Sequence, residues 1–551
     1  MRQFPSTLKD GGPLPPQVGI WIFEKMSVYL RQQTEKTLKM VEINSLLLKD
    51  FYKAVHSEML PKGMTKSVSY YTPRMTRIKT WDKVVNFGLQ MFIKTWLIDG
   101  FNKNFFNRDE DTVVEEYRRV LDNAMGRSTY DIEKVRKLHK LGYLPIEIIS
   151  LPEGYMVPMG CPIFGITNTH PDFAWLPQAL ESLISAEMWY PMITATVGHE
   201  YRRVVNRWYQ LTCDDVTPRS RALGNFDFRG DMGVDAALKA SAGWLLSFVN
   251  TATVPAIPFM EAMYNCDCTK DEVGFGAVST EHFVMCSNSA KDISDNPDET
   301  YEYKDIDPRR ERVFLKRLLT ELYPTTSFSC VCDSYDYWNV VKNILPTLKT
   351  EILNHEGCFL VRGDSGDCVE VVTETVFELW KIFGGKVNSK GYKVLDPHVR
   401  ALYGDSITIE RAKKIYSILA ENGFAACNVS LGVGSFSMHC VEIDGTLQPF
   451  TRDTFGVAIK ACDAIIDGKE YPIYKDPKTD RETGHGFKKS QKGACRVFWR
   501  DKMTNTLTYE DGLAYEESLN DNLMRPVFRD GMILEEETLK GIRNRLNNGA
   551  F

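Results

Sequence analysis

The sequence lacks the features that would place it in a membrane or hold it together by disulfides. No apolar run approaches the roughly 18 residues that a membrane-spanning helix needs, and the N-terminus lacks the basic, then apolar, then small-residue order of a signal peptide. The 13 cysteines include no Cys-x-x-Cys pair, so neither a zinc knuckle nor a dithiol redox motif is indicated. An odd, dispersed set of cysteines is typical of reduced thiols. We therefore expect a cytoplasmic protein that binds no membrane.

The sequence also has little net charge of either sign. Its 67 lysines and arginines nearly balance its 73 aspartates and glutamates, which leaves a formal net charge of −6. An overall attraction to nucleic acid is therefore not expected, and basic side chains must act locally. The 551 residues, 43% of them hydrophobic, have an ordinary globular composition and are long enough for two to four domains.

Changes of pattern along the chain predict four segments. Strand-like and helical pieces are mixed in the second segment, and apolar strands alternate with helical stretches in the third. We assign an N-terminal extension to residues 1–40, the first part of an α+β domain to 41–180, an α/β barrel catalytic domain to 181–450, and a C-terminal part that packs with the α+β domain to 451–551. A charged stretch inside the third segment, residues 287–312, is expected to be a solvated loop.

The stretch "LVRGDSGDCVEVV", residues 360–372, has the pattern of a buried strand, a tight polar turn and a helix. Gly363 and Gly366 suit the turn, and Arg362, Asp364 and Ser365 would lie at the carboxyl end of the strand. In α/β folds this is where ligands bind. The turn is therefore the first candidate for a functional site.

Similar strand ends recur in "FSCVCD", "VRALYGD" and "ACNVSLGVG". Asp333, Asp364 and Asp405 follow successive strands, which fits consecutive βα units and an irregular α/β barrel. A single aspartate at such a place is commonly a helix cap. Three in consecutive units, one beside an arginine, favour a site that holds Mg²⁺ and sugar hydroxyls through carboxylates and pyrophosphate through the planar guanidinium.

An ordered set of motifs resembles the nicotinamide phosphoribosyltransferases, a type II phosphoribosyltransferase family similar to the nicotinate phosphoribosyltransferases. The set comprises "KDFYKAVH", "FDFRG", "STEHF", "CDSYDYW", "VRGDSGD", "LYGD", "FTRD" and "YKDP", within a likeness that runs from about residue 44 to about residue 493. The resemblance implies an enzyme of NAD salvage that transfers phosphoribose from 5-phosphoribosyl 1-pyrophosphate to nicotinamide. It also implies a need for Mg²⁺ and a homodimer whose subunits share their active sites.

The resemblance implies roles for individual residues. Asp333 and Asp364 would hold ribose hydroxyls and Mg²⁺, Arg229 and Arg362 would grip pyrophosphate, and His282 would accept a phosphoryl group from ATP. The nicotinamide ring would stack between Phe226 and the Tyr52 of the other subunit. Further implied substrate contacts are Ser365, Gly404, Asp405, Gly434 and Ser435, together with the basic residues Arg452, Lys460, Lys475 and, as a looser match, Lys488.

Two departures from the family pattern keep alternatives open. Ala252 stands where the family has an aspartate that accepts the nicotinamide amide, so nicotinate is an alternative base. Phe436 interrupts the glycine-rich loop, and the segment that follows, including "HCVEIDGTLQ", is longer than expected. These two features favour ADP-ribose pyrophosphate as an alternative donor, which would give NAD directly. A scaffold protein that only keeps the fold is a further alternative.

Overall fold

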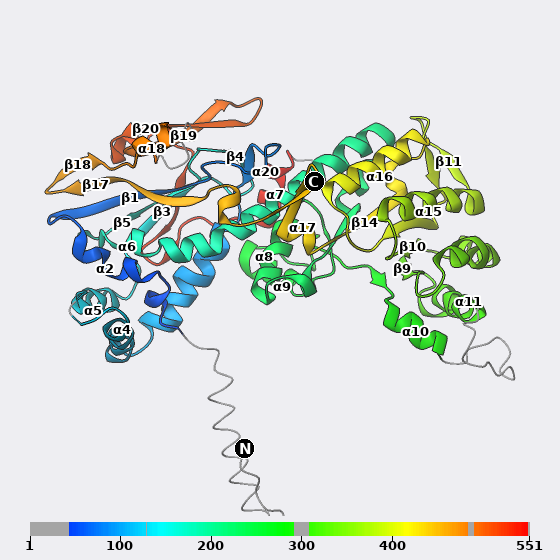
Figure 1. The fold of residues 1–551 in the computed structure, drawn as a ribbon, viewed down its shortest axis with the longest axis horizontal. Helices are drawn as coiled ribbons and strands as arrows, with labels where there is room; N and C mark the ends of the chain where they lie inside the picture. The colour runs from blue at the N-terminus through cyan, green and yellow to red at the C-terminus, as the bar shows by residue number, and fades with distance from the viewer. Residues whose placement is uncertain (1–42, 128, 291–307, 483–489, 549–551) are drawn as a thin grey trace, which may run out of the picture. The chain divides into compact units, whose positions relative to one another are not determined.

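The computed structural model describes residues 43–127, 129–290, 308–482 and 490–548 (Figure 1). The predicted N-terminal extension and Lys488 therefore lie outside the described residues. Backbone contacts divide the chain into two compact units, one with residues up to 48 and 100–142, the other with 49–99 and everything from 143 onward. The division at residues 180 and 450 stays a prediction.

The smaller unit is helical. Its main helices are α4 (Glu110–Ala124) and α5 (Ile132–Leu141). Asp109 and Asp131 cap their N-termini by accepting backbone N–H groups, and Gly142 ends α5 in the left-handed conformation. In the described part of the chain as a whole, no helix combines the length and the apolar character that a membrane span requires.

The larger unit contains a seven-stranded antiparallel sheet. Its strand order is β18-β17-β1-β5-β3-β21-β22, with the bounds β1 Met64–Thr72, β3 Ile146–Ser150, β5 Phe164–Asn168, β17 Ala458–Ile466, β18 Lys469–Pro472, β21 Arg525–Arg529 and β22 Met532–Ile533. The pairing of β1 with β17 joins strands from the two ends of the chain. Between β3 and β5 the chain adds β4 (Met156–Pro158), which pairs instead with β2 (Lys83–Val85).

The same unit contains a seven-stranded sheet in which every neighbouring pair is parallel. Its order is β7-β6-β14-β13-β10-β9-β8, with the bounds β6 Leu223–Phe226, β7 Asn250–Thr251, β8 Val278–Ser279, β9 Phe328–Val331, β10 Phe359–Gly363, β13 Val399–Tyr403 and β14 Val429–Gly434. Phe275 exchanges backbone hydrogen bonds with Val249 and Thr251, shortly before β8 pairs with the opposite edge. The sheet therefore curls, as the predicted irregular α/β barrel requires.

Helices follow these strands as the sequence predicts. The turn after β10 leads into α15 (Cys368–Phe383), and β13 leads into α16 (Ile409–Glu421); both helices lie beside the parallel sheet (Figure 1). The apolar positions Val369, Val372, Val376 and Leu379 of α15 recur at helical spacing and are buried. Burial of each such side chain contributes about 1.5–3 kcal/mol. This packing fixes the turn that carries Arg362 and Asp364.

The prediction of a loop over residues 287–312 is wrong at both ends, where the structure has helices. Helix α10 (His282–Ala290) continues past its start, and helix α11 (Pro308–Arg317) begins before its end. Met285 of α10 and Phe314 and Leu315 of α11 bury their side chains. Serine and asparagine follow Met285, and charges precede and follow the other two residues, so neither helix shows a clear apolar period in the sequence. His282 is the first residue of α10, three residues after the end of β8 at Ser279.

Candidate active site

The ends of β9 and β10 bring the predicted catalytic residues together around Asp333. His282 Nε2 lies 3.1 Å from Asp333 Oδ1. The backbone N–H of Asp364 and the hydroxyl of Ser365 donate to Asp333 Oδ2 at 3.1 Å and 2.6 Å. The Asp333 side chain is only 4% exposed, whereas that of His282 is 44% exposed. Asp333 therefore fixes the imidazole ring and the turn after β10 at once.

Arg362 and Asp364 form an ion pair beside this network. Arg362 Nη2 lies 3.3 Å from Asp364 Oδ1, and Nη1 donates to the Thr280 carbonyl at 3.5 Å. Arg362 Nε is buried without a hydrogen-bond partner among the described residues. A Cβ at Gly404 would lie 2.3 Å from Asp364 Oδ1 and 2.4 Å from Arg362 Nε. Only glycine at position 404 therefore leaves room for the pair.

The next strand ends bring a second set of predicted residues together. A Cβ at Gly434 would lie 2.0 Å from Asp405 Oδ1, and a Cβ at Gly230 would lie 2.1 Å from Ser435 Oγ. The segment "FRG", which carries the exposed Arg229, therefore meets the glycine-rich end of β14. Small residues on both sides allow the two backbones to approach each other.

A buried acidic pair beside Phe226 was missed in the sequence. Asp227 accepts hydrogen bonds from Asn225 at 2.9 Å and Thr253 at 3.4 Å, and its burial and then the charge of Asp231 raise the pKa of Asp227 to about 7. Asp231 Oδ1 accepts from the Tyr190 hydroxyl at 3.3 Å. In the sequence, the one sign of this acidic pair is that both aspartates lie directly next to "FRG", at positions 227 and 231.

The longer segment after Gly434 is anchored on this pair. Its residues form α17 (Phe436–His439) and a hairpin of β15 (Cys440–Ile443) and β16 (Thr446–Pro449). His439 Nε2 lies 3.0 Å from Asp231 Oδ1, and this contact raises the pKa of His439. Phe436 remains 44% exposed. The hairpin is thus a structured addition next to the strand ends.

The residues expected from the partner subunit lie on or next to the antiparallel sheet and on α2 (Phe51–Met59): Lys460 is on β17, and Arg452 begins a short 3-10 helix before that strand. Tyr52 is 55% exposed, and its hydroxyl donates to Asp50 at 3.2 Å. Lys460 pairs with Glu181 at 3.0 Å, and Arg452 pairs with Asp453 at 2.7 Å. Within the described part of one chain, no ring contact joins Tyr52 to Phe226. Lys475 is exposed just after β18.

Sequence comparisons point to one family. The description "Nicotinate phosphoribosyltransferase (NAPRTase) family" matches residues 270–531, and "Nicotinamide phosphoribosyltransferase, N-terminal domain" matches residues 44–148. A nicotinamide phosphoribosyltransferase of Acinetobacter baylyi is 35% identical over 528 residues, which cover 92% of this chain and 97% of the relative. The chain belongs to the nicotinamide phosphoribosyltransferase family. A second member, from Xanthomonas campestris pv. campestris, is 29% identical and covers 91% of this chain and 97% of its own.

Solved structures support the fold of this nicotinamide phosphoribosyltransferase family member. The nicotinate-nucleotide pyrophosphorylase from Pyrococcus furiosus superposes with a TM-score of 0.55 and 14% identity, covering 93% of this chain and 96% of its own. Human nicotinic acid phosphoribosyltransferase superposes with a TM-score of 0.53 and 15% identity, covering 91% and 93%. The α/β barrel with a second α+β part, predicted from the sequence, is confirmed.

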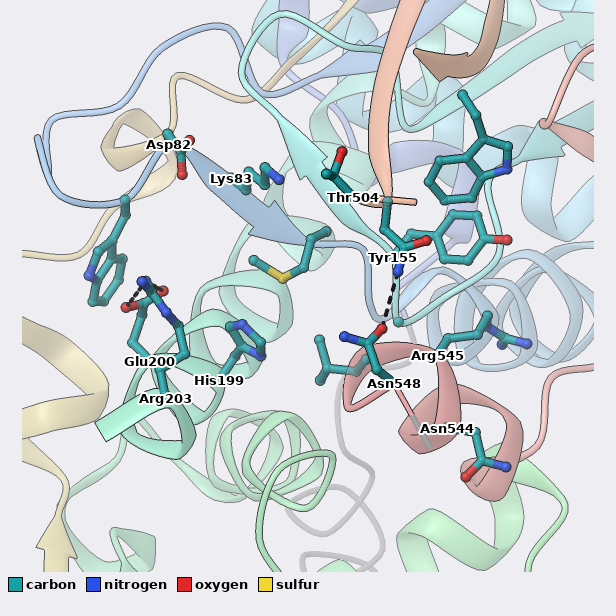
Figure 2. A pocket seen from close by; sticks show the side chains of 16 residues that line it. Asp82, Lys83, Tyr155, His199, Glu200, Arg203, Thr504, Asn544, Arg545 and Asn548 are labelled. Atoms are coloured by element: carbon teal, nitrogen blue, oxygen red, sulfur yellow. Dashed lines mark hydrogen bonds and ion pairs between the residues drawn. The ribbon is translucent and has the colours of Figure 1, made fainter. Parts of the chain in front are cut away.

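A separate cavity of about 500 Å³ lies in the larger unit of this family member (Figure 2). It is lined by α7 (Glu181–Thr212), by β2 and β4, by the β19–β20 hairpin (Ala494–Asp501 and Thr506–Leu513), and by α20 (Leu539–Leu546). Glu200 and Arg203 pair at 2.9 Å on its α7 wall. None of the predicted site residues is among its lining residues, so we place the candidate active site at the barrel strand ends.

Proposed function

We propose that this chain transfers phosphoribose from 5-phosphoribosyl 1-pyrophosphate to nicotinamide, giving nicotinamide mononucleotide and pyrophosphate in NAD salvage. The observation that carries the proposal is the connected set of His282, Asp333, Asp364 and Arg362 at the ends of β9 and β10. Relatives that cover nearly the whole chain bear the name of this activity. The proposal makes the chain a pentosyltransferase.

The charges of the site suit the reaction. Cleavage of the bond between C1 of ribose and the pyrophosphate oxygen gives the ribose oxocarbenium character and leaves negative charge on the departing oxygen. Asp364 would face the ribose, while the exposed Arg229 and the guanidinium of Arg362 would donate to pyrophosphate. These interactions strengthen as the charges develop, which is what lowers the barrier.

Asp364 fits Mg²⁺ better than Asp333 does. Both oxygens of Asp333 already accept hydrogen bonds, and its side chain is almost fully buried. Asp364 Oδ2 accepts no hydrogen bond from a described residue, and its side chain is 21% exposed. We assign Asp364 as the protein ligand of Mg²⁺, which when bound would neutralise pyrophosphate charge. In this proposal Asp333 orients His282, and its expected role as a second ligand of Mg²⁺ stays a prediction.

The contact with Asp333 also prepares His282 for phosphorylation. With the proton on Nε2 donated to Asp333, the lone pair of Nδ1 can attack the γ-phosphorus of ATP as the bond to the ADP oxygen breaks. Nδ1 has no partner among the described residues. ATP would then act as a coupling substrate, and its hydrolysis would drive the synthesis.

The exposed residues Tyr52, Arg452, Lys460 and Lys475 would complete the site of a second subunit in a cytoplasmic homodimer. In this proposal Phe226 supplies one face of the slot for the nicotinamide ring and the partner's Tyr52 supplies the other. Ser365, Gly404, Asp405, Gly434 and Ser435 would line the path of the ribose and its 5′-phosphate, where backbone amides near glycines can approach an anion.

Product analysis by mass spectrometry tests this function. The purified protein with Mg²⁺, 5-phosphoribosyl 1-pyrophosphate and nicotinamide should form nicotinamide mononucleotide and release pyrophosphate. A parallel reaction with ADP-ribose pyrophosphate tests the second candidate, which the anchored 440–449 hairpin and the exposed Phe436 favour. NAD as the main product would replace the proposed donor. No pyrophosphate release with either donor would reject both and leave the scaffold alternative.

A further inference from the structure

Asn250 lies on the face of the parallel sheet that carries Arg362. Arg362 is the cross-strand partner of Leu402, which in turn is the partner of Ser430. Two residues after Ser430, Gly432 pairs with Gly224, and Gly224 pairs with Asn250. Cross-strand partners share a face, and so do residues two apart in a strand. The register therefore places Asn250 and Phe226 on the same face as the candidate active site.

The Asn250 amide lies next to the Phe226 ring. A Cβ at Gly224 would lie 2.8 Å from Asn250 Nδ2 and 3.1 Å from Phe226 Cε2, so both groups border the space that this glycine leaves open. The neighbouring Gly432 is also closely packed, because a Cβ at this position would lie 2.3 Å from the Gly404 carbonyl oxygen. Gly404, Gly432 and Gly224 thus form a floor of main-chain atoms, with Phe226 and Asn250 at one end.

The Asn250 side chain is available to a ligand while its backbone is held. The Trp244 indole N–H donates to the Asn250 carbonyl at 3.0 Å, and Asn250 also bridges to Phe275. The side-chain amide makes no hydrogen bond to any residue that the structure describes, and the residue is only half-buried. An unpaired carboxamide beside an aromatic ring offers one acceptor and two donors to a flat polar ligand.

We propose that the Asn250 side chain binds the carboxamide substituent of the pyridine base and helps to set base selectivity. The inference rests on the proposed function and on Phe226 as the ring platform. Ala252, two residues further on, offers no acceptor, and its N–H is used by the Asn225 carbonyl at 2.8 Å. Asn250 Oδ1 can accept from the nicotinamide –NH₂ while Nδ2 donates to its carbonyl oxygen. A neutral amide can also donate to a carboxylate, so nicotinate should be rejected only weakly.

Steady-state kinetics with nicotinamide and nicotinate, at saturating donor and Mg²⁺, test this role. Asn250→Ala should raise the KM for nicotinamide about tenfold, the loss expected for one to two hydrogen bonds, while kcat changes by less than about threefold. Asn250→Asp should keep nicotinamide as a substrate but raise the KM for nicotinate by more than about tenfold, because two carboxylates repel each other. This change of base preference is not expected from loss of packing alone.

A relocated acceptor provides the matched control. The double variant Asn250→Ala/Ala252→Asp places a carboxylate two residues along the same face and should recover most of the affinity for nicotinamide. If the wild-type protein turns over neither base, the proposed function fails and this inference fails with it. If the wild-type protein is active but both Asn250 variants keep its KM values for the two bases, the assignment of Asn250 alone is overturned.

Discussion

Two groups of residues differ in burial and hydrogen bonding. The first lies at the barrel strand ends, and the second consists of Tyr52, Arg452 and Lys460, which are expected to come from a partner subunit. Asp333 connects to His282, Asp364 and Ser365 by direct hydrogen bonds, and it is almost fully buried. In the second group, Tyr52 of α2 is more than half exposed, and Arg452, just before β17, pairs with its neighbour in sequence, Asp453. One group is a finished network within a single chain. The other consists of more exposed side chains with separate ion pairs and hydrogen bonds, such as Lys460 with Glu181.

This difference separates residues that are positioned within one chain from residues that would need a ligand or a second subunit to fix their positions. A buried, hydrogen-bonded carboxylate is positioned before any ligand arrives, so it can act without a reorganisation cost. Exposed ion pairs contribute about 0–1 kcal/mol and exchange partners easily. The exposed side chains of Tyr52 and Arg452 are the members of this group that can contact a molecule outside the chain, and the shared site that we propose depends on this.

The largest expected effect separates two aspartates of the same turn. Asp364→Ala should lower kcat/KM at least about 100-fold with little change in stability, because it removes the partner of Arg362 and the free carboxylate oxygen. Asp367 accepts the N–H groups of Val369 and Glu370 at 3.0 Å and caps α15. Asp367→Ala should instead lower the free energy of unfolding by about 1 kcal/mol and keep most activity. Steady-state kinetics and urea unfolding of both variants measure these two effects. Near-wild-type activity of Asp364→Ala would exclude this aspartate from the mechanism.

The next effect tests whether the two groups work together across subunits. Tyr52→Ala and Phe226→Ala should each lower kcat/KM about tenfold or more, since each loses one face of the ring slot. Mixing the two variants should restore part of the activity, because some mixed dimers contain one intact slot. An isolated monomer should be nearly inactive. If differentially tagged variants exchange subunits and no activity returns, the Tyr52 of one subunit has no share in the site of the other.

A smaller effect on activity is expected at His282, the exposed member of the network around Asp333. His282→Ala should abolish the stimulation of the reaction by ATP and affect the ATP-independent rate less, because only the phosphoryl acceptor is lost. Glu281→Ala, an exposed neighbour, serves as the control and should keep the stimulation. Rates with and without ATP give the comparison, and equal stimulation in His282→Ala and the wild type would exclude phosphoryl transfer to this histidine.

The smallest effect is a pH dependence of stability to which Asp227 contributes on the barrel side. Because the folded-state pKa of Asp227 is raised to about 7, the folded protein binds a proton that the unfolded chain releases near pH 4. The free energy of unfolding should therefore fall as the pH rises from about 4 to about 7. Asp227→Asn should remove roughly 1–2 kcal/mol of this fall. Parallel urea titrations at several pH values measure it, and identical slopes for variant and wild type would contradict the buried-acid assignment.

Much of the parallel sheet and its strand-end residues could be predicted because the sequence patterns that indicate them are local. An apolar run, two glycines and two aspartates predicted β10, its turn and α15, and the recurrence of the pattern predicted the parallel sheet. Asn250 and the contact of His439 with Asp231 could not be found this way. A two-residue strand has no period, and a contact between distant segments depends on the whole fold. Helix α10 was missed because its second half is polar, and helix α11 was missed because charges surround its few buried residues.

The row of Gly404, Gly432 and Gly224 has a consequence for how this enzyme family can change. Because the floor of the proposed site is made of peptide units, its shape is independent of side-chain identity at neighbouring positions. If this site binds the base as we propose, mutation would alter the accepted ring at its borders, such as positions 226, 250 and 252. A lineage could then exchange one pyridine for another in single steps there, while the carboxylates and arginines proposed for the chemistry stay untouched.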